Sequence, residues 1–115
     1  MAFDANANVT VGAGGKLLYD GEKTANSTDA LTLNGGASLT VKDGGSVLVT
    51  NAMSNVTVAG GHGRSSCLTV EEGGEFTYQA ESSGMLVVLK DLGQIDVAGT
   101  FRIWQMFDNK QIFSQ

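Results

Sequence analysis

The sequence contains no proline, a single cysteine, and few charged or aromatic side chains. Charged residues make up 17% and aromatic residues 7% of the 115 residues, whereas glycine occurs 16 times. Abundant glycine without proline excludes collagen-like and proline-rich linker sequences. Because Cys67 is alone, it forms no intramolecular disulfide and belongs to no cysteine-rich metal site. We therefore expect a domain that is held together by its core, without a metal or another cofactor.

Two further absences limit the classes of function. The net charge is −5 and the pI is about 4.5, so the chain lacks the basic face that direct binding to nucleic acid or to an anionic membrane requires. The longest apolar run, residues 85–89, is far too short for a membrane span, and the N-terminus does not resemble a secretory signal. We expect a cytoplasmic protein if the chain is complete. A segment of an adhesin would instead be secreted or lie on the bacterial cell surface.

An eleven-residue pattern recurs along the chain and joins two short alternating strands through a glycine pair. Its copies are VTVGAGGKLLY at 9–19, LTVKDGGSVLV at 39–49, LTVEEGGEFTY at 68–78 and a degraded VVLKDLGQIDV at 87–97. Such short strands hold a hairpin together poorly, but they can stack as rungs about 4.8 Å apart. The repeat therefore predicts a single all-β domain, a short right-handed parallel β-helix (a solenoid) of about three to four coils. A β-sandwich or another all-β fold is the alternative.

The domain is expected to consist of an N-terminal cap (1–8), coils (9–100) and a C-terminal cap (101–115). The last segment departs from the glycine-rich pattern and holds four of the eight aromatic residues. We expect it to form a short amphipathic turn or helix across the last coil. The alternative is an exposed surface for self-association or partner binding, with Trp104 and Phe107 as contact residues.

Stacked coils predict columns of equivalent residues. Alignment of the four copies gives the inward columns Val9/Leu39/Leu68/Val87, Val11/Val41/Val70/Leu89, Leu17/Val47/Phe76/Ile95 and Tyr19/Val49/Tyr78/Val97. In the turn that follows the first strand, it gives the columns Gly12/Lys42/Glu71/Lys90 and Ala13/Asp43/Glu72/Asp91. Alternating charges in the former turn column favour this register over a slipped one. The acids Asp43, Glu71, Glu72 and Asp91 are candidate binding residues, and the simplest interpretation of them is as solvated turn residues.

The segment AGGHGRSSCL at 59–68 holds the only histidine and the only cysteine. A nucleophile pair of Cys67 and His62 would need a third, orienting group that the local sequence does not offer. A phosphate-binding loop is excluded, because such a loop precedes a helix and this one precedes a strand. We predict a surface loop with a half-buried Cys67, in which His62 and Arg64 are candidate binding residues. No enzymatic activity is expected.

Three polar loops, at 20–30, 50–55 and 79–84, each follow the last strand of a coil. In a solenoid they would project from one edge, which is the usual binding face of repeat scaffolds. The longest of these loops contains the candidate binding residues Glu22 and Asn26. We therefore expect an acidic loop edge as a second candidate surface.

The repeats LTVKDGGSVLV and LTVEEGGEFTY resemble the β-helical stalks of bacterial autotransporter passengers and related large adhesins, over residues 8–100. The resemblance implies a right-handed β-helix that serves surface display, adhesion or self-association. It carries over no binding residues, because the rungs of that family are scaffold. We therefore predict a non-catalytic binding or structural module with a protein or glycan partner, and homo-oligomers through the aromatic cap.

An alternative function follows from the acidic charge and the short chain. A small intracellular inhibitor of phage or mobile-element origin, in the manner of an anti-CRISPR protein, would block a nucleic-acid-binding partner by presenting acids to its basic surface. Charge reversal at Glu71 and Glu72 would impair such an inhibitor, whereas truncation of the loop at 20–30 would impair a loop-edge binder.

Overall fold

The computed structural model describes residues 2–4, 6–20, 31–52, 56–61, 63–80, 87–90, 92–105 and 110–114. These residues form β-strands and turns, and none of them is helical. The strands are β1 (Ala2–Phe3), β2 (Asn8–Val11), β3 (Lys16–Asp20), β4 (Leu31–Asn34), β5 (Ser38–Val41), β6 (Ser46–Ala52), β7 (Val56–Ala59), β8 (Ser66–Val70), β9 (Glu75–Ala80), β10 (Val87–Lys90), β11 (Gly93–Val97), β12 (Thr100–Gln105) and β13 (Lys110–Ser114).

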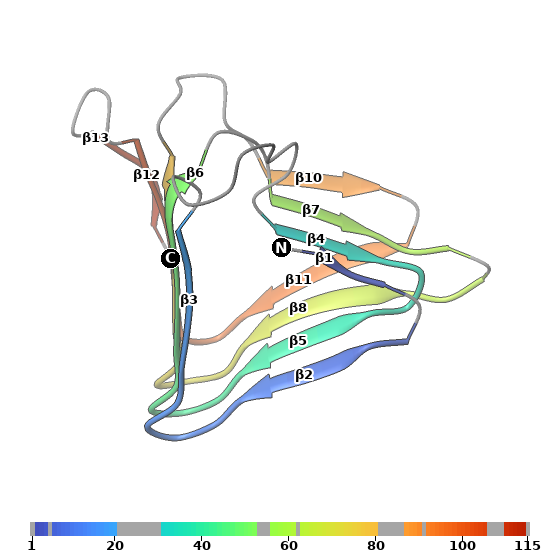
Figure 1. Ribbon diagram of the computed structural model, residues 1–115, viewed down its shortest axis with the longest axis horizontal. Coiled ribbons are helices and arrows are strands. Elements are labelled where there is room, and N and C mark those ends of the chain that lie inside the picture. The colour runs from blue at the N-terminus through green and yellow to red at the C-terminus, as the bar shows by residue number, and fades with distance from the viewer. Residues whose placement is uncertain are drawn as a thin grey trace.

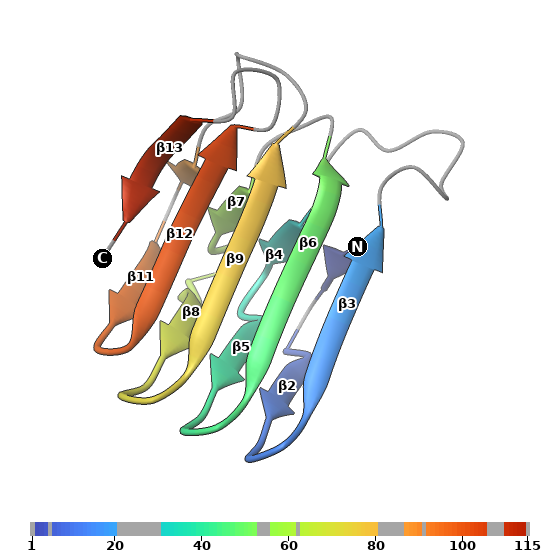
Figure 2. The same ribbon diagram turned by 90° about the vertical axis from the view of Figure 1, so that its left-hand side faces the viewer.

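The strands belong to three sheets that face a common interior (Figure 1). The first sheet has the order β1-β4-β7-β10, the second β2-β5-β8-β11 and the third β3-β6-β9-β12-β13. Three consecutive strands, one in each sheet, make up what we call a pass, and each strand pairs in parallel with its counterpart in the next pass. The exception is β13, which is antiparallel to β12 at the end of the third sheet (Figure 2). The prediction of an all-β chain with parallel strands is confirmed.

The core consists of inward columns that run through successive passes. Register pairs confirm the predicted columns through their first three members, Val9/Leu39/Leu68, Val11/Val41/Val70, Leu17/Val47/Phe76 and Tyr19/Val49/Tyr78. The members from the second and third passes are almost fully buried. This burial follows from the period-two alternation, because every second side chain of each strand points to the interior.

The predicted fourth member of every column is wrong. Ile95 and Val97 pair with Leu68 and Val70, whereas Val87 and Leu89 pair with Val56 and Val58 in the first sheet. The remaining two columns end in Phe101 and Ile103, which pair with Phe76 and Tyr78. The rings of Phe76 and Phe101 stack with their centroids 5.0 Å apart.

The segment 87–97 spans the corner between the first and second sheets, whereas the alignment of the repeats predicts the corner between the second and third sheets. Its eleven residues align without a gap with 31–41, which span β4, a turn and β5. In that alignment Leu92 takes the place of Gly36, and both have a positive φ, as has Asn6 at the same corner of the first pass. Lys90 therefore lies beside Ala59 and not beside Glu71. Asp91 lies outside the described residues.

Glycine pairs form the corner between the second and third sheets. The first glycine of each pair, Gly14, Gly44 and Gly73, has a φ of 77° to 85°, which is unfavourable for residues with a Cβ. The second glycine permits close stacking, since a Cβ on Gly45 would lie 2.5 Å from the carbonyl oxygen of Val11. The passes are joined here by backbone hydrogen bonds, such as that from the amide of Lys42 to the carbonyl of Val11 at 2.9 Å.

The C-terminal segment does not form the expected amphipathic turn or helix over 100–105 and 110–114. These residues are the strands β12 and β13. The sequence TFRIWQ alternates with period two, so Phe101 and Ile103 continue the inward columns and become buried. Trp104 is half-buried and pairs with Gln79 and Gln111 on its two sides. Phe107 lies outside the described residues, and a capping role of 101–115 stays a prediction.

Substitution of Gly45 by alanine is expected to destabilise the protein by about 2 kcal/mol, because the new methyl group would collide with backbone carbonyls of the preceding pass. The matched control is Gly12→Ala at the same corner, where an added Cβ meets nothing within 4 Å and φ is not positive. Urea unfolding monitored by circular dichroism measures both free energies. Equal effects of the two substitutions would contradict close stacking at this corner.

Candidate functional site

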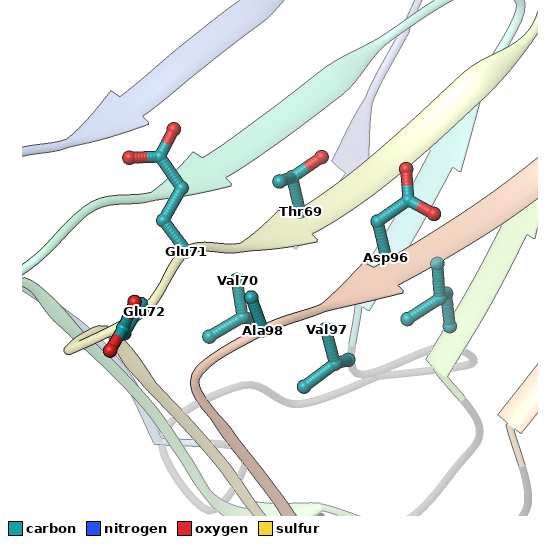
Figure 3. A pocket seen from close by; sticks show the side chains of 8 residues that line it. Thr69, Val70, Glu71, Glu72, Asp96, Val97 and Ala98 are labelled. Atoms are coloured by element: carbon teal, nitrogen blue, oxygen red, sulfur yellow. The ribbon is translucent and has the colours of Figure 1, made fainter.

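A shallow, open groove lies where the second sheet ends at β11 (Figure 3). It encloses about 480 Å³ and is lined by residues of β8, β11 and the two turns that follow them. The lining residues are Thr69, Val70, Glu71, Glu72, Ile95, Asp96, Val97 and Ala98.

The groove exists because the turn between the second and third sheets is shorter in the last pass than in the third pass. Four residues, Glu71–Gly74, connect β8 to β9, whereas two residues, Ala98 and Gly99, connect β11 to β12. The strands on both sides remain in register, with Val97 beside Val70 and Thr100 beside Glu75. The outermost part of the longer turn, Glu72 and Gly73, is therefore not covered by the last pass and stays exposed.

Backbone hydrogen bonds hold the short turn of the last pass against the equivalent turn of the third pass. The amides of Ala98 and Gly99 both donate to the carbonyl of Val70, at 2.8 and 3.1 Å, and the amide of Thr100 donates to Gly74. A Cβ on Gly99 would lie 2.2 Å from the carbonyl oxygen of Glu71, so the close approach requires glycine at this position. These contacts hold the short turn in place, and the part of the longer turn that extends beyond it forms one wall of the groove.

The acidic and the apolar lining residues lie on opposite faces of the second sheet. Figure 3 shows the carboxylates of Glu71 and Asp96 projecting on the side of the sheet that carries Thr69, with Glu72 at the turn. Glu71 forms an ion pair with Lys42 at 3.9 Å, in which both side chains are about half exposed. The thiol of Cys67 donates to Asp96 at 3.7 Å. Val70, Ile95 and Val97 belong to the inward columns and supply the apolar part of the lining.

This arrangement suits binding of an extended cationic segment. Among the described strands, β11 pairs only with β8, so its outer edge has no partner strand. An open strand edge can accept a further strand through backbone hydrogen bonds, and neighbouring acids favour lysine or arginine in that strand. Within the described part of the chain, no group of three or more His, Cys, Asp or Glu side chains is placed to hold a metal ion.

The structure brings together some of the predicted site residues and separates others. Glu71 and Glu72 line the groove, and Asp43 stacks against Gly73 one pass earlier. Arg64 and Trp104 belong to other parts of the fold, the former at the corner between the first and second sheets and the latter in the third sheet. The predicted residues Glu22, Asn26, His62, Asp91 and Phe107 lie outside the described residues.

Arg64 has a structural role in an enlarged corner. Seven residues, 60–66, separate Ala59 from Cys67, where the preceding pass has only three, 35–37, at this corner. The insertion folds back on itself through paired backbone hydrogen bonds between Gly61 and Arg64, 3.0 Å each. The Arg64 side chain crosses Gly36 of the second pass, and its guanidinium donates to the Asn6 side chain of the first. It thereby links three successive passes.

Sequence reasoning missed Asp96, Ile95 and Ala98 as groove residues. The alignment of the repeats predicts Val87 at the position beside Leu68 that Ile95 occupies in the structure. The sequence does contain a signal for the observed register, because 87–97 aligns with 31–41 without a gap. In both segments apolar and polar residues alternate as expected for a strand, a turn and a second strand. Cys67 is half-buried, as expected, but it belongs to the strand β8 and not to a surface loop.

Comparison with protein-family models, curated proteins and solved structures yields no match for this chain. In the described residues, no helix has the length and apolar character to cross a membrane.

The register that builds the groove predicts a specific disulfide. In a Gln94→Cys variant, the new thiol would be the register partner of Cys67 on the neighbouring strand, at a distance that a disulfide can bridge. We expect mild oxidation to form an intramolecular bond, detected by peptide mapping under non-reducing conditions.

The matched comparison is Leu86→Cys, which the sequence-based register would place beside Cys67. Efficient formation of a disulfide in the Leu86→Cys variant, together with failure of the Gln94→Cys variant to form one, would contradict the described register and remove the basis for the groove.

Proposed function

We propose that the chain is a right-handed parallel β-helix that works as a non-catalytic binding and structural module. The proposal is supported by the succession of passes through three sheets and by columns that continue from pass to pass. Such a framework places apolar side chains inside and leaves turns and outer faces to contact a partner. The resemblance of the repeats to adhesin stalks agrees with a scaffold of this kind.

The partner that we propose is an extended, basic segment of another protein. The observation that carries this proposal is the groove, in which the acids Glu71, Glu72 and Asp96 gather at the ends of β8 and β11, and β11 is the last strand of its sheet among the described strands. A protein segment suits the groove better than a glycan, because a peptide backbone can pair with the exposed edge of a strand. Alternate residues of the added segment would face the apolar lining, and the others would face the acids.

An acidic inhibitor is the second candidate, and a different observation favours it. Asp43 and Glu72 are exposed on adjacent turns of one corner, outside the ion pair between Lys42 and Glu71. Acids stacked on neighbouring turns present a row of negative charge that suits a folded, basic nucleic-acid-binding surface. Such a partner would contact the whole corner and would need no open strand edge.

The proposed groove function predicts binding of a peptide with alternating lysine and valine. Fluorescence anisotropy with a labelled peptide should give saturable binding, and Glu72→Lys or Asp96→Lys should weaken it about tenfold, which corresponds to about 1.4 kcal/mol. The matched control is Asp4→Lys, which changes the net charge equally at the first pass, away from the groove. Equal weakening by the control would reveal non-specific charge attraction and would refute the groove as the site.

Asp43→Asn separates the two candidates, because Asp43 does not line the groove. A strand added at β11 should bind this variant as it binds the unsubstituted protein. An inhibitor that presents the acidic corner should lose affinity for its basic partner when Asp43 or Glu72 is neutralised.

A further inference from the structure

A second open edge lies at the opposite end of the third sheet. The strand β3 ends this sheet, and among the described strands only β6 pairs with it. Figure 2 shows β3 as the outermost strand on the side away from β13. Unpaired edges of this kind recruit other strands unless they are covered.

The hydrogen-bond pattern shows which residues face this open edge. The amide of Ser46 donates to the carbonyl of Gly15 at 3.1 Å, just before β3 begins. In a parallel ladder, bonding residues alternate along the strand, so Leu17 and Tyr19 bond to β6. The backbone groups of Lys16, Leu18 and Asp20 are thus the ones that point away from the sheet.

The sequence of β3, Lys-Leu-Leu-Tyr-Asp, is complementary to itself when read in the reverse direction. In an antiparallel pair centred on Leu18, Lys16 lies opposite Asp20 of the second strand, and Leu17 lies opposite Tyr19. Opposite charges that face each other across a strand pair are stabilising, whereas like charges are destabilising. A strand with the same charge at both ends would lack this complementarity.

Apolar surface at this end of the molecule gives a second reason for a partner. Leu18 is 66% exposed, more than any other large hydrophobic residue in the described part of the chain. The inward residues Val9, Leu17 and Tyr19 are only partly buried, whereas their counterparts in the second pass are almost fully buried. The opposite end of the same sheet already accepts an antiparallel strand, β13, so a change of strand direction fits its geometry.

We propose that two copies of the chain associate through β3, which pairs with β3 of the second copy in antiparallel fashion around Leu18. The two-fold axis passes through the Leu18 pair, so the interface is isologous and closes as a dimer. It forms two identical pairs between Lys16 and Asp20 and joins the third sheets of the two copies into one. This interface differs from the groove and from the aromatic C-terminal segment, so it stands independently of the proposed function.

The charge pattern provides the test. Sedimentation velocity of the full chain over a range of concentrations should reveal a dimer. Lys16→Glu, which sets two acids opposite each other, should weaken the dimer about tenfold or more. The double variant Lys16→Glu with Asp20→Lys exchanges the charges and should restore dimerisation. If Lys16→Glu acted only by damaging the fold, the second substitution would not restore the dimer.

A disulfide trap locates the interface directly. In a Cys67→Ser background, Leu18→Cys should give a disulfide-linked dimer on oxidation, because the residue lies opposite its own copy. The control is Leu48→Cys, the register partner of Leu18 on the next strand, which would be three strands from its own copy and should remain unlinked.

Three results would overturn the proposal. These are a monomer at all concentrations, a dimer that is insensitive to Lys16→Glu, and equal crosslinking of the Leu18→Cys and Leu48→Cys variants. Peptide binding at the groove is measured separately, so its loss with an intact dimer would refute only the proposed function.

Discussion

The stacking of one pass directly on the next, with backbone atoms in contact at the corners, is the constraint on which the structure depends. Carbonyls of one pass accept hydrogen bonds from amides of the next, as between Val11 and Lys42 or Val41 and Glu71. Any side chain at Gly45, Gly74 or Gly99 would enter the space that these carbonyls occupy. Glycine is therefore required where the passes meet, and side-chain columns supply the apolar contacts between the corners.

Departures from perfect repetition create the features that distinguish one surface from another. The last turn between the second and third sheets is two residues shorter than its predecessor, and this exposes Glu72 and opens the groove. The corner of the third pass is longer, which allows Arg64 to reach across to Asn6. The repeats thus provide a uniform framework, and the irregular turns provide the specific surfaces. At the ends, β3 and β11 each have one edge that no other described strand pairs with.

The glycine-paired repeats were sufficient to predict parallel all-β structure and the first three members of each core column. Local alternation and turn chemistry determine these features, and both are visible in the sequence. The last pass could not be placed in this way, because Leu92-Gly93 resembles the glycine pairs of one corner but occupies another. The strand character of 100–105 was missed because aromatic residues suggested a cap. The residues that line the groove depend on which turn stacks on which. The sequence points to Glu71 and Glu72 as candidate binding residues. It does not point to Asp96, because the predicted register of the last pass differs from that of the structure.

The register of the four passes supports both the groove and the columns, and it can be measured in solution. Methyl NOEs in a sample labelled at isoleucine, leucine and valine would report which inward side chains touch. We expect contacts from Leu39 to Leu68 and from Leu68 to Ile95, in one continuous column. A contact between Leu68 and Val87, without one between Leu68 and Ile95, would contradict the stacking of the last pass and with it the proposed binding groove.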